Sequence, residues 1–121
     1  MRFMMLYKPG VETDAPPTPE HVAEMGSYIQ KTAQSGVLLA TDGLQHSKKG
    51  ARVQIAKGGV KGGKFTITDG PFTEAKELVA GFAIVQVASK DEAIELAKEF
   101  LTIVGQGETE IRQMHDAPAL A

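Results

Sequence analysis

Apolar residues recur along this chain with two different periods, which predicts both strands and helices. Residues 3–7 form a short apolar run that ends at a Lys-Pro-Gly turn, as expected of a buried strand. Residues 37–40 form a second such run. Residues 78–88 form the longest one, and its β-branched residues and glycine favour a strand over a helix. Alternating side chains predict three further strands, at 52–55, 64–68 and 110–114.

Two segments show helical spacing between capping signals. Thr18 precedes Pro19, so the hydroxyl and the proline mark the start of a helix over 19–35, and Gly36 marks its end. Ser89 and Glu92 form a capping box ahead of a second helical face that ends before Gly105. The pattern therefore predicts two helices, each between two strands.

The element order is β-α-β, then a hairpin made of strands 52–55 and 64–68, then β-α-β. Right-handed crossovers place both helices on one side of one sheet, so we expect a ferredoxin-like α+β fold with an antiparallel sheet. Residues 1–116 are expected to form a single domain, and residues 117–121 a loose C-terminal tail.

The run at 78–88 is apolar on both faces of the predicted strand. Phe82 and Ile84 lie on one face, and Val85 and Val87 lie on the other. Because helices cover only one face of such a sheet, a strand of this kind needs a second cover. We expect a homodimer in which two sheets pack face to face, with a ligand cleft at the rim of the interface.

The composition of the chain argues against several classes of function and partner. The 121 residues are enough for one domain with a core, and a net charge of -2 argues against a nucleic-acid partner. The chain has no cysteine, which excludes disulfides and thiolate chemistry. No apolar stretch approaches the roughly 20 residues of a membrane span. We expect a soluble, cytoplasmic protein without a membrane or nucleic-acid partner, although lysines bunch locally at Lys48, Lys49, Lys57, Lys61 and Lys64.

Two patterns that suggest ligand chemistry are weak. Residues 58–64 fit a phosphate-loop spacing, but Phe65 stands where a Ser or Thr is needed and the segment lies between two strands, so it predicts a hairpin turn. The three histidines, His21, His46 and His115, lack metal-ligand spacing, so no metal and no cofactor is predicted. His46, which follows a turn, is the strongest functional candidate of the three.

The segment 68–77 gathers three carboxylates and a lysine around a Gly-Pro turn and one aromatic ring. In one interpretation Asp69 bonds its own backbone, Phe72 plugs the core, and Glu74 and Lys76 are surface charges. In the other interpretation these residues border a ligand site.

Residues 69–77, Asp-Gly-Pro-Phe-Thr-Glu-Ala-Lys-Glu, closely resemble the signature of the YCII-related, or DGPF-domain, family. The resemblance continues at 23–26, 43–44, 49–50, 78–82 and 110–113. It therefore extends over nearly the whole chain. It implies a dimeric α+β barrel, and it implies cofactor-free chemistry on small organic compounds, as in the wider superfamily.

The resemblance also implies site residues. Many relatives carry a histidine on the first helix where this chain has Met25, and a glutamate where it has Asp42. We therefore expect Asp42 or Asp69 to act as proton acceptor, with Lys76 or His46 stabilising an anion. The candidate substrate-binding residues are Tyr7, Met25, Phe72, Glu74 and Lys76.

Three functions stay open at this point. The first is binding of a small anionic or aromatic molecule in the homodimer, with or without acid/base conversion of that molecule. The second is an accessory or regulatory protein-interaction module, which the resemblance links to transcription factors. In the third, the segment 69–77 only holds the hairpin to the sheet.

Overall fold

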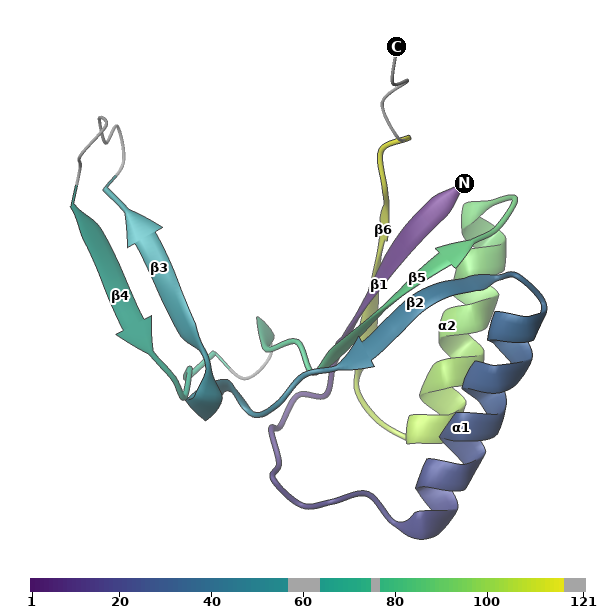
Figure 1. The fold of residues 1–121 in the computed structure, drawn as a ribbon, viewed down its shortest axis with the longest axis horizontal. Coiled ribbons are helices and arrows are strands. Elements are labelled where there is room, and N and C mark those ends of the chain that lie inside the picture. Colours follow the sequence, from purple (N-terminus) through teal and green to yellow (C-terminus); the bar gives the residue numbers. More distant parts are fainter. Residues whose placement is uncertain (57–63, 75–76, 117–121) are drawn as a thin grey trace.

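A computed structural model describes residues 1–56, 64–74 and 77–116 of the chain (Figure 1). The elements are β1 (Arg2–Lys8), α1 (Pro19–Gln34), β2 (Leu38–Gly43), a short 3-10 helix (Ser47–Lys49), β3 (Ala51–Ile55), β4 (Phe65–Asp69), β5 (Gly81–Gln86), α2 (Lys90–Val104) and β6 (Glu108–Gln113). No helix of these residues is long and apolar enough to cross a bilayer. The predicted tail at 117–121 lies outside the described residues.

Four of the strands form one sheet in the order β2-β5-β1-β6, and every neighbouring pair is antiparallel. Both helices lie on the same side of this sheet (Figure 1). This order confirms the predicted ferredoxin-like α+β class, because two β-α-β units interleave their strands in that way.

The helix ends follow the capping signals of the sequence. The Thr18 hydroxyl accepts a hydrogen bond from the His21 amide at 3.2 Å, with Pro19 at the first helical position of α1. The Ser89 hydroxyl accepts one from the Glu92 amide at 3.2 Å at the start of α2. Gly105 ends α2 in the left-handed region at φ 82°. Both predicted helices are confirmed.

The core lies between α2 and the middle of the sheet. Its buried residues are Phe3, Met5, Val85, Val87, Ala93 and Ala97. The two alanines let α2 approach the sheet closely, whereas α1 has no fully buried residue at all. The space between α1 and the sheet is therefore not closed by packing.

The strand predicted at 78–88 is shorter in the structure, where β5 spans Gly81–Gln86. Leu78 is buried, but it lies ahead of the strand, beneath the loops around residues 44–50. The apolar run at 78–88 therefore has two causes: residues 81–86 form a strand of the sheet, and Leu78 is buried against the loops around residues 44–50.

The helix-free face of the sheet carries the alternate side chains of the central strands. Met4 pairs with Ile84, and Leu6 pairs with Phe82. All four are only half-buried in the single chain. This is the face for which the sequence predicted a second cover.

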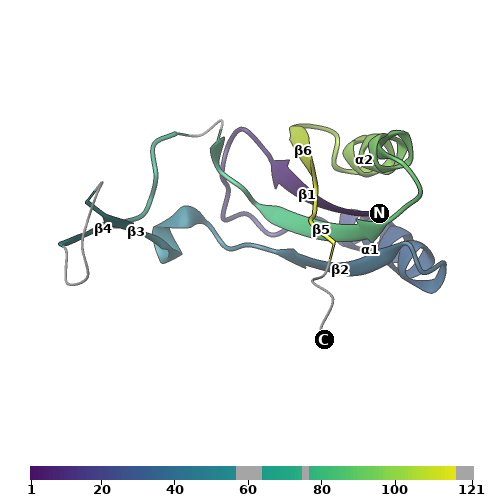
Figure 2. The same cartoon turned by 90° about the horizontal axis from the view of Figure 1, so that it is seen from above.

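Strands β3 and β4 form a separate two-stranded sheet that projects away from the body of the molecule (Figures 1 and 2). Val53 pairs with Ile67 and Ile55 pairs with Phe65, so the four apolar side chains share one face. All four are exposed. The predicted hairpin is confirmed, whereas its glycine-rich turn lies outside the described residues.

Candidate functional site

A cavity of about 400 Å³ lies between the two helices and the sheet. Its wall comes from α1, from α2 and from strands β1, β2 and β5. The lining residues are Met5, Tyr7, Met25, Tyr28, Ile29, Thr32, Val37, Leu38, Thr41, Asp42, Gly43, Ala80, Gly81, Phe82, Ala83, Val85, Leu96, Phe100 and Val104. The cavity lies beside α1, which unlike α2 has no buried residue.

The face that α1 turns to the cavity consists of Met25, Tyr28, Ile29 and Thr32, which lie three, four and seven residues apart. The Tyr28 hydroxyl crosses to α2 and donates to the carbonyl oxygen of Leu96 at 3.2 Å. Large side chains thus span the gap between the helices without filling it.

The other hydroxyls of the wall also donate to backbone carbonyls. Tyr7 donates to Gln106 at 2.9 Å, and its ring meets the ring of Phe100 edge-on at 5.1 Å. Thr32 donates to Tyr28 at 2.7 Å, and Thr41 donates to Phe82 at 2.9 Å. These bonds fix the orientation of the polar groups around an otherwise apolar space.

Both tyrosines keep their protons at neutral pH. Burial, helped by the negative charge of Glu99, raises the pKa of Tyr28 to about 12. Burial also raises the pKa of Tyr7. Neither phenol is therefore a proton acceptor under ordinary conditions.

Asp42 is the carboxylate that borders the cavity. It lies at the rim in the edge strand β2, is exposed, and pairs with Phe82, so its side chain lies on the helix-free side of the sheet. One of its oxygens accepts a hydrogen bond from the Gly43 amide at 3.0 Å. Within residues 1–56, 64–74 and 77–116, its second oxygen has no hydrogen-bond partner.

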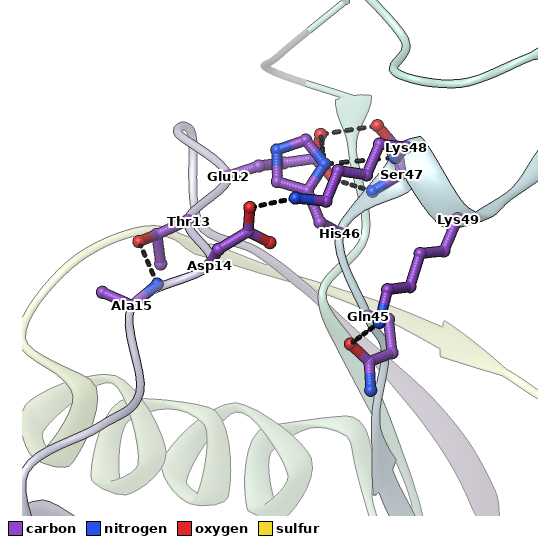
Figure 3. A network of polar contacts seen from close by, with 9 residues as sticks. All are labelled: Glu12, Thr13, Asp14, Ala15, Gln45, His46, Ser47, Lys48 and Lys49. Carbon is purple, nitrogen blue, oxygen red and sulfur yellow. Dashed lines mark hydrogen bonds and ion pairs between the residues drawn. The ribbon is translucent and has the colours of Figure 1, made fainter.

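A second polar cluster lies at the base of the hairpin (Figure 3). The Glu12 carboxylate accepts from the Ser47 amide at 2.8 Å and from the Ser47 hydroxyl at 2.6 Å. It lies 3.5 Å from Nδ1 of His46, which accepts from the Lys48 amide at 3.1 Å. The Ser47 hydroxyl bond is the main reason that the pKa of Glu12 lies below its ordinary value.

The predicted signature segment packs against this cluster. The Phe72 amide donates to the Ser47 hydroxyl at 3.0 Å. The Arg52 guanidinium lies 4.0 Å from the centre of the Phe72 ring and bonds the Glu74 carboxylate at 2.9 Å. A hollow of about 440 Å³ opens beside these residues, and Glu12 and His46 also line it.

The structure therefore separates the predicted site residues into groups. Tyr7, Met25 and Asp42 meet in the cavity between helices and sheet. His46 and Phe72 line the hollow at the base of the hairpin, where the exposed Glu74 binds Arg52. Asp69 is exposed on β4, and Lys76 lies outside the described residues.

Some residues of the cavity and of the cluster were missed by sequence reasoning. Tyr28 and Thr32 share the α1 face of Met25, so helical spacing gave a signal for them. Ser47 and Glu12 lie 35 residues apart, and no local pattern connects them. In the part of the chain that the structure describes, no group of three or more His, Asp or Glu residues is placed to hold a metal ion.

Comparison with known proteins shows the family of the chain and a distant likeness to solved structures. The model of the YCII-related domain matches residues 1–116. The chain is also similar to the solved structure of 5-chloro-2-hydroxyhydroquinone dehydrochlorinase (TftG) from Burkholderia phenoliruptrix AC1100 in complex with 2,5-dihydroxybenzoquinone. The identity is 13% and the TM-score 0.47, over 97% of this chain and 96% of that chain. No curated protein matches the chain.

Proposed function

The chain belongs to the YCII-related domain family, and from that premise we propose that it binds a small organic molecule in the cavity between α1, α2 and the sheet. The observation that supports this is the cavity itself, about 400 Å³ in volume and lined mainly by apolar and aromatic side chains. Small-molecule sites typically have about 300–1,000 Å³ and a few fixed polar groups. The sequence placed the site at the rim of a dimer interface, whereas this cavity lies on the helix side of one chain.

Asp42 is the residue in this proposal that gives the site chemical capacity. A carboxylate beside an apolar cavity accepts a hydrogen bond from a ligand, and it accepts a proton if the ligand is acidic enough. The two tyrosines hold their protons. Their rings form part of the cavity wall, and their hydroxyl oxygens can accept hydrogen bonds. The proposal thus covers binding, and conversion by acid/base chemistry without a cofactor would fall to Asp42.

The binding proposal is tested by filling the cavity from within. Ala83 lines it and lies beside Met5 in the sheet, so Ala83→Leu adds three carbon atoms to an open space. With 2-naphthol as the probe, we expect saturable binding to the natural chain and at least about a tenfold loss of affinity in the variant. Calorimetric titration measures the affinity of the natural chain and of the variant. The melting temperature of the variant should not fall.

The matched control is Ala88→Leu, which adds the same carbons at an exposed position just after β5. This control should bind 2-naphthol like the natural chain. Equal affinity of Ala83→Leu and the natural chain, or no saturable binding by the natural chain at all, contradicts the proposal.

We also propose that the protein is a homodimer whose helix-free sheet faces pack together. The half-buried Met4, Leu6, Phe82 and Ile84 supply the apolar centre that such an interface needs. The exposed apolar face of the hairpin adds a second surface that its own chain does not cover in the described residues.

The dimer is tested by Leu6→Arg, in the middle of the helix-free face. The long arginine stem covers apolar surface in a lone chain, but its charge opposes burial between two sheets. Light scattering should give twice the 12.9 kDa of one chain for the natural protein and a shift toward the single-chain mass for the variant. Val22→Arg, on the exposed side of α1, is the control and should remain dimeric. A natural protein that runs as one chain at micromolar concentration contradicts this proposal.

A second candidate function is the accessory protein-interaction module, and the projecting hairpin favours it. Val53, Ile55, Phe65 and Ile67 give that hairpin an exposed apolar face of the kind that marks interaction sites. A stoichiometric partner from cell extract that is lost with Ile67→Asp would support the module. A homodimer that purifies without another protein counts against it.

A further inference from the structure

The hollow at the base of the hairpin is separate from the cavity between the helices and the sheet. It has a volume of about 440 Å³, and no residue that lines it also lines the cavity. Part of its lining is apolar, because Leu44, Phe72 and the buried Leu78 contribute to it. The hollow therefore offers room and apolar contact to a small organic molecule.

The guanidinium group of Arg52, which lines this hollow, is held in place by two neighbours. Its carbon atom lies 4.0 Å from the centre of the Phe72 ring, and its Nη1 bonds the Glu74 carboxylate at 2.9 Å. Among the described residues this is the one hydrogen bond of a group that has five N–H donors. A guanidinium whose orientation is already fixed loses little freedom when it binds a further carboxylate.

The other charged groups of the hollow also favour an acceptor as ligand. Two carboxylates line it in the described part of the chain, and both already have partners. Glu12 accepts two hydrogen bonds from Ser47, and Glu77 lies 3.4 Å from the ammonium group of Lys8. The ammonium group of Lys49, in contrast, bonds only a neutral amide oxygen at 3.4 Å among the described residues. A ligand therefore finds more open donors than open acceptors in this hollow.

We propose that the hollow is a second ligand site, and that it binds a small organic anion in which an apolar body carries a carboxylate. The carboxylate bonds the remaining N–H donors of Arg52, since guanidinium and carboxylate match in a planar, two-pronged geometry. Lys49 adds a second positive charge, and the apolar body packs against Leu44 and Leu78. This site does not depend on the proposed function of the cavity, because the two spaces share no lining residue.

Three probes with one ring system test the class of ligand. They are 2-naphthoate, which is an anion, 2-naphthamide, which has nearly the same shape without the charge, and the cation 2-naphthylmethylammonium. The titrations use the Ala83→Leu variant, in which binding in the cavity is weakened. Calorimetry should show saturable binding of 2-naphthoate, with the other two probes at least about tenfold weaker.

Variants of the two cations test whether the anion binds in the hollow. Arg52→Gln should weaken binding of 2-naphthoate at least about tenfold, and Arg52→Lys, which keeps the charge without the fork, should recover only part of that loss. Lys49→Gln leaves the contact between Arg52 and Phe72 in place and should weaken binding about threefold. The control Lys98→Gln removes an exposed ammonium group from α2, away from the hollow, and should leave the affinity unchanged.

The outcomes distinguish this site from the cavity. If 2-naphthoate does not bind saturably, or if 2-naphthamide binds as tightly, the anion site is wrong, whereas the cavity is still judged by 2-naphthol. Unchanged affinity for 2-naphthoate in both Arg52→Gln and Lys49→Gln also overturns the proposal. So does an affinity for 2-naphthoate that falls from the natural chain to Ala83→Leu but not to Arg52→Gln, because the anion would then lie in the cavity.

Discussion

Gly70→Ala is expected to detach the segment around Phe72 from the turn at residues 47–50. A Cβ at Gly70 would lie 1.7 Å from the carbonyl oxygen of Ser47 and 2.5 Å from its carbonyl carbon. These are backbone atoms, so no side-chain rotation relieves the overlap. We expect the free energy of unfolding to fall by about 3 kcal/mol or more, which corresponds to a melting temperature lower by roughly 10–15 °C.

The measurement is thermal and denaturant unfolding, with hydrogen exchange at the Phe72 amide as a local reporter. That amide donates to the Ser47 hydroxyl, so its protection should be lost in the variant. Gly26→Ala is the control, because a Cβ at Gly26 in α1 has no neighbour within 4 Å. Alanine there should stabilise the helix by about 0.5–1 kcal/mol. Unchanged stability and protection in Gly70→Ala would contradict the close packing of this turn.

This contact bears on the role of the segment 69–77. Gly70, Phe72 and Glu74 each contact the hairpin or the turn before it, through Ser47 and Arg52. Such contacts support the structural interpretation for these residues. Asp69 makes no comparable contact among the described residues, and it lies on the exposed β4, apart from the cavity that Asp42 borders. The motif that stands out in the sequence and the cavity are therefore different places in the molecule.

The helices and strands were predictable because their signals are local. Thr18 and Ser89 cap helices through amides three residues away, and the pleat of a strand repeats every second residue. The alternation of side chains at 52–55 and 64–68 likewise predicted the hairpin. Alternation does not say which surface covers the apolar face of a strand, so the exposure of Val53 and Ile67 could not be predicted.

The cavity was not predictable for a related reason. Val22, Met25 and Ile29 recur at helical spacing along α1, but Val22 is 55% exposed. The face toward the cavity is turned to include Tyr28 and Thr32, whose hydroxyls bond backbone carbonyls. How far a helix stands from its sheet depends on side chains of both partners, and these are distant in the sequence.

Phe3→Ala is expected to cost about 3–5 kcal/mol of unfolding free energy, because Phe3 is only 2% exposed and packs in the centre of the core. A domain of this size typically has about 6–18 kcal/mol in total, so about a sixth of the stability or more would be lost. Phe65→Ala is the matched control, since Phe65 on the hairpin is 64% exposed. In a lone chain it should change stability by no more than about 0.5 kcal/mol.

Unfolding of both variants at several protein concentrations extends this comparison to the proposed dimer. The cost of Phe3→Ala should be the same at each concentration, because the cavity it creates lies within one chain. If the hairpin packs against a second copy, Phe65→Ala should instead raise the concentration needed for dimerisation and thereby lower the melting temperature most in dilute solution. A Phe65→Ala protein with the same dimerisation constant as the natural chain would show that the hairpin lies outside the dimer interface. A Phe3→Ala protein of natural stability would contradict the core itself.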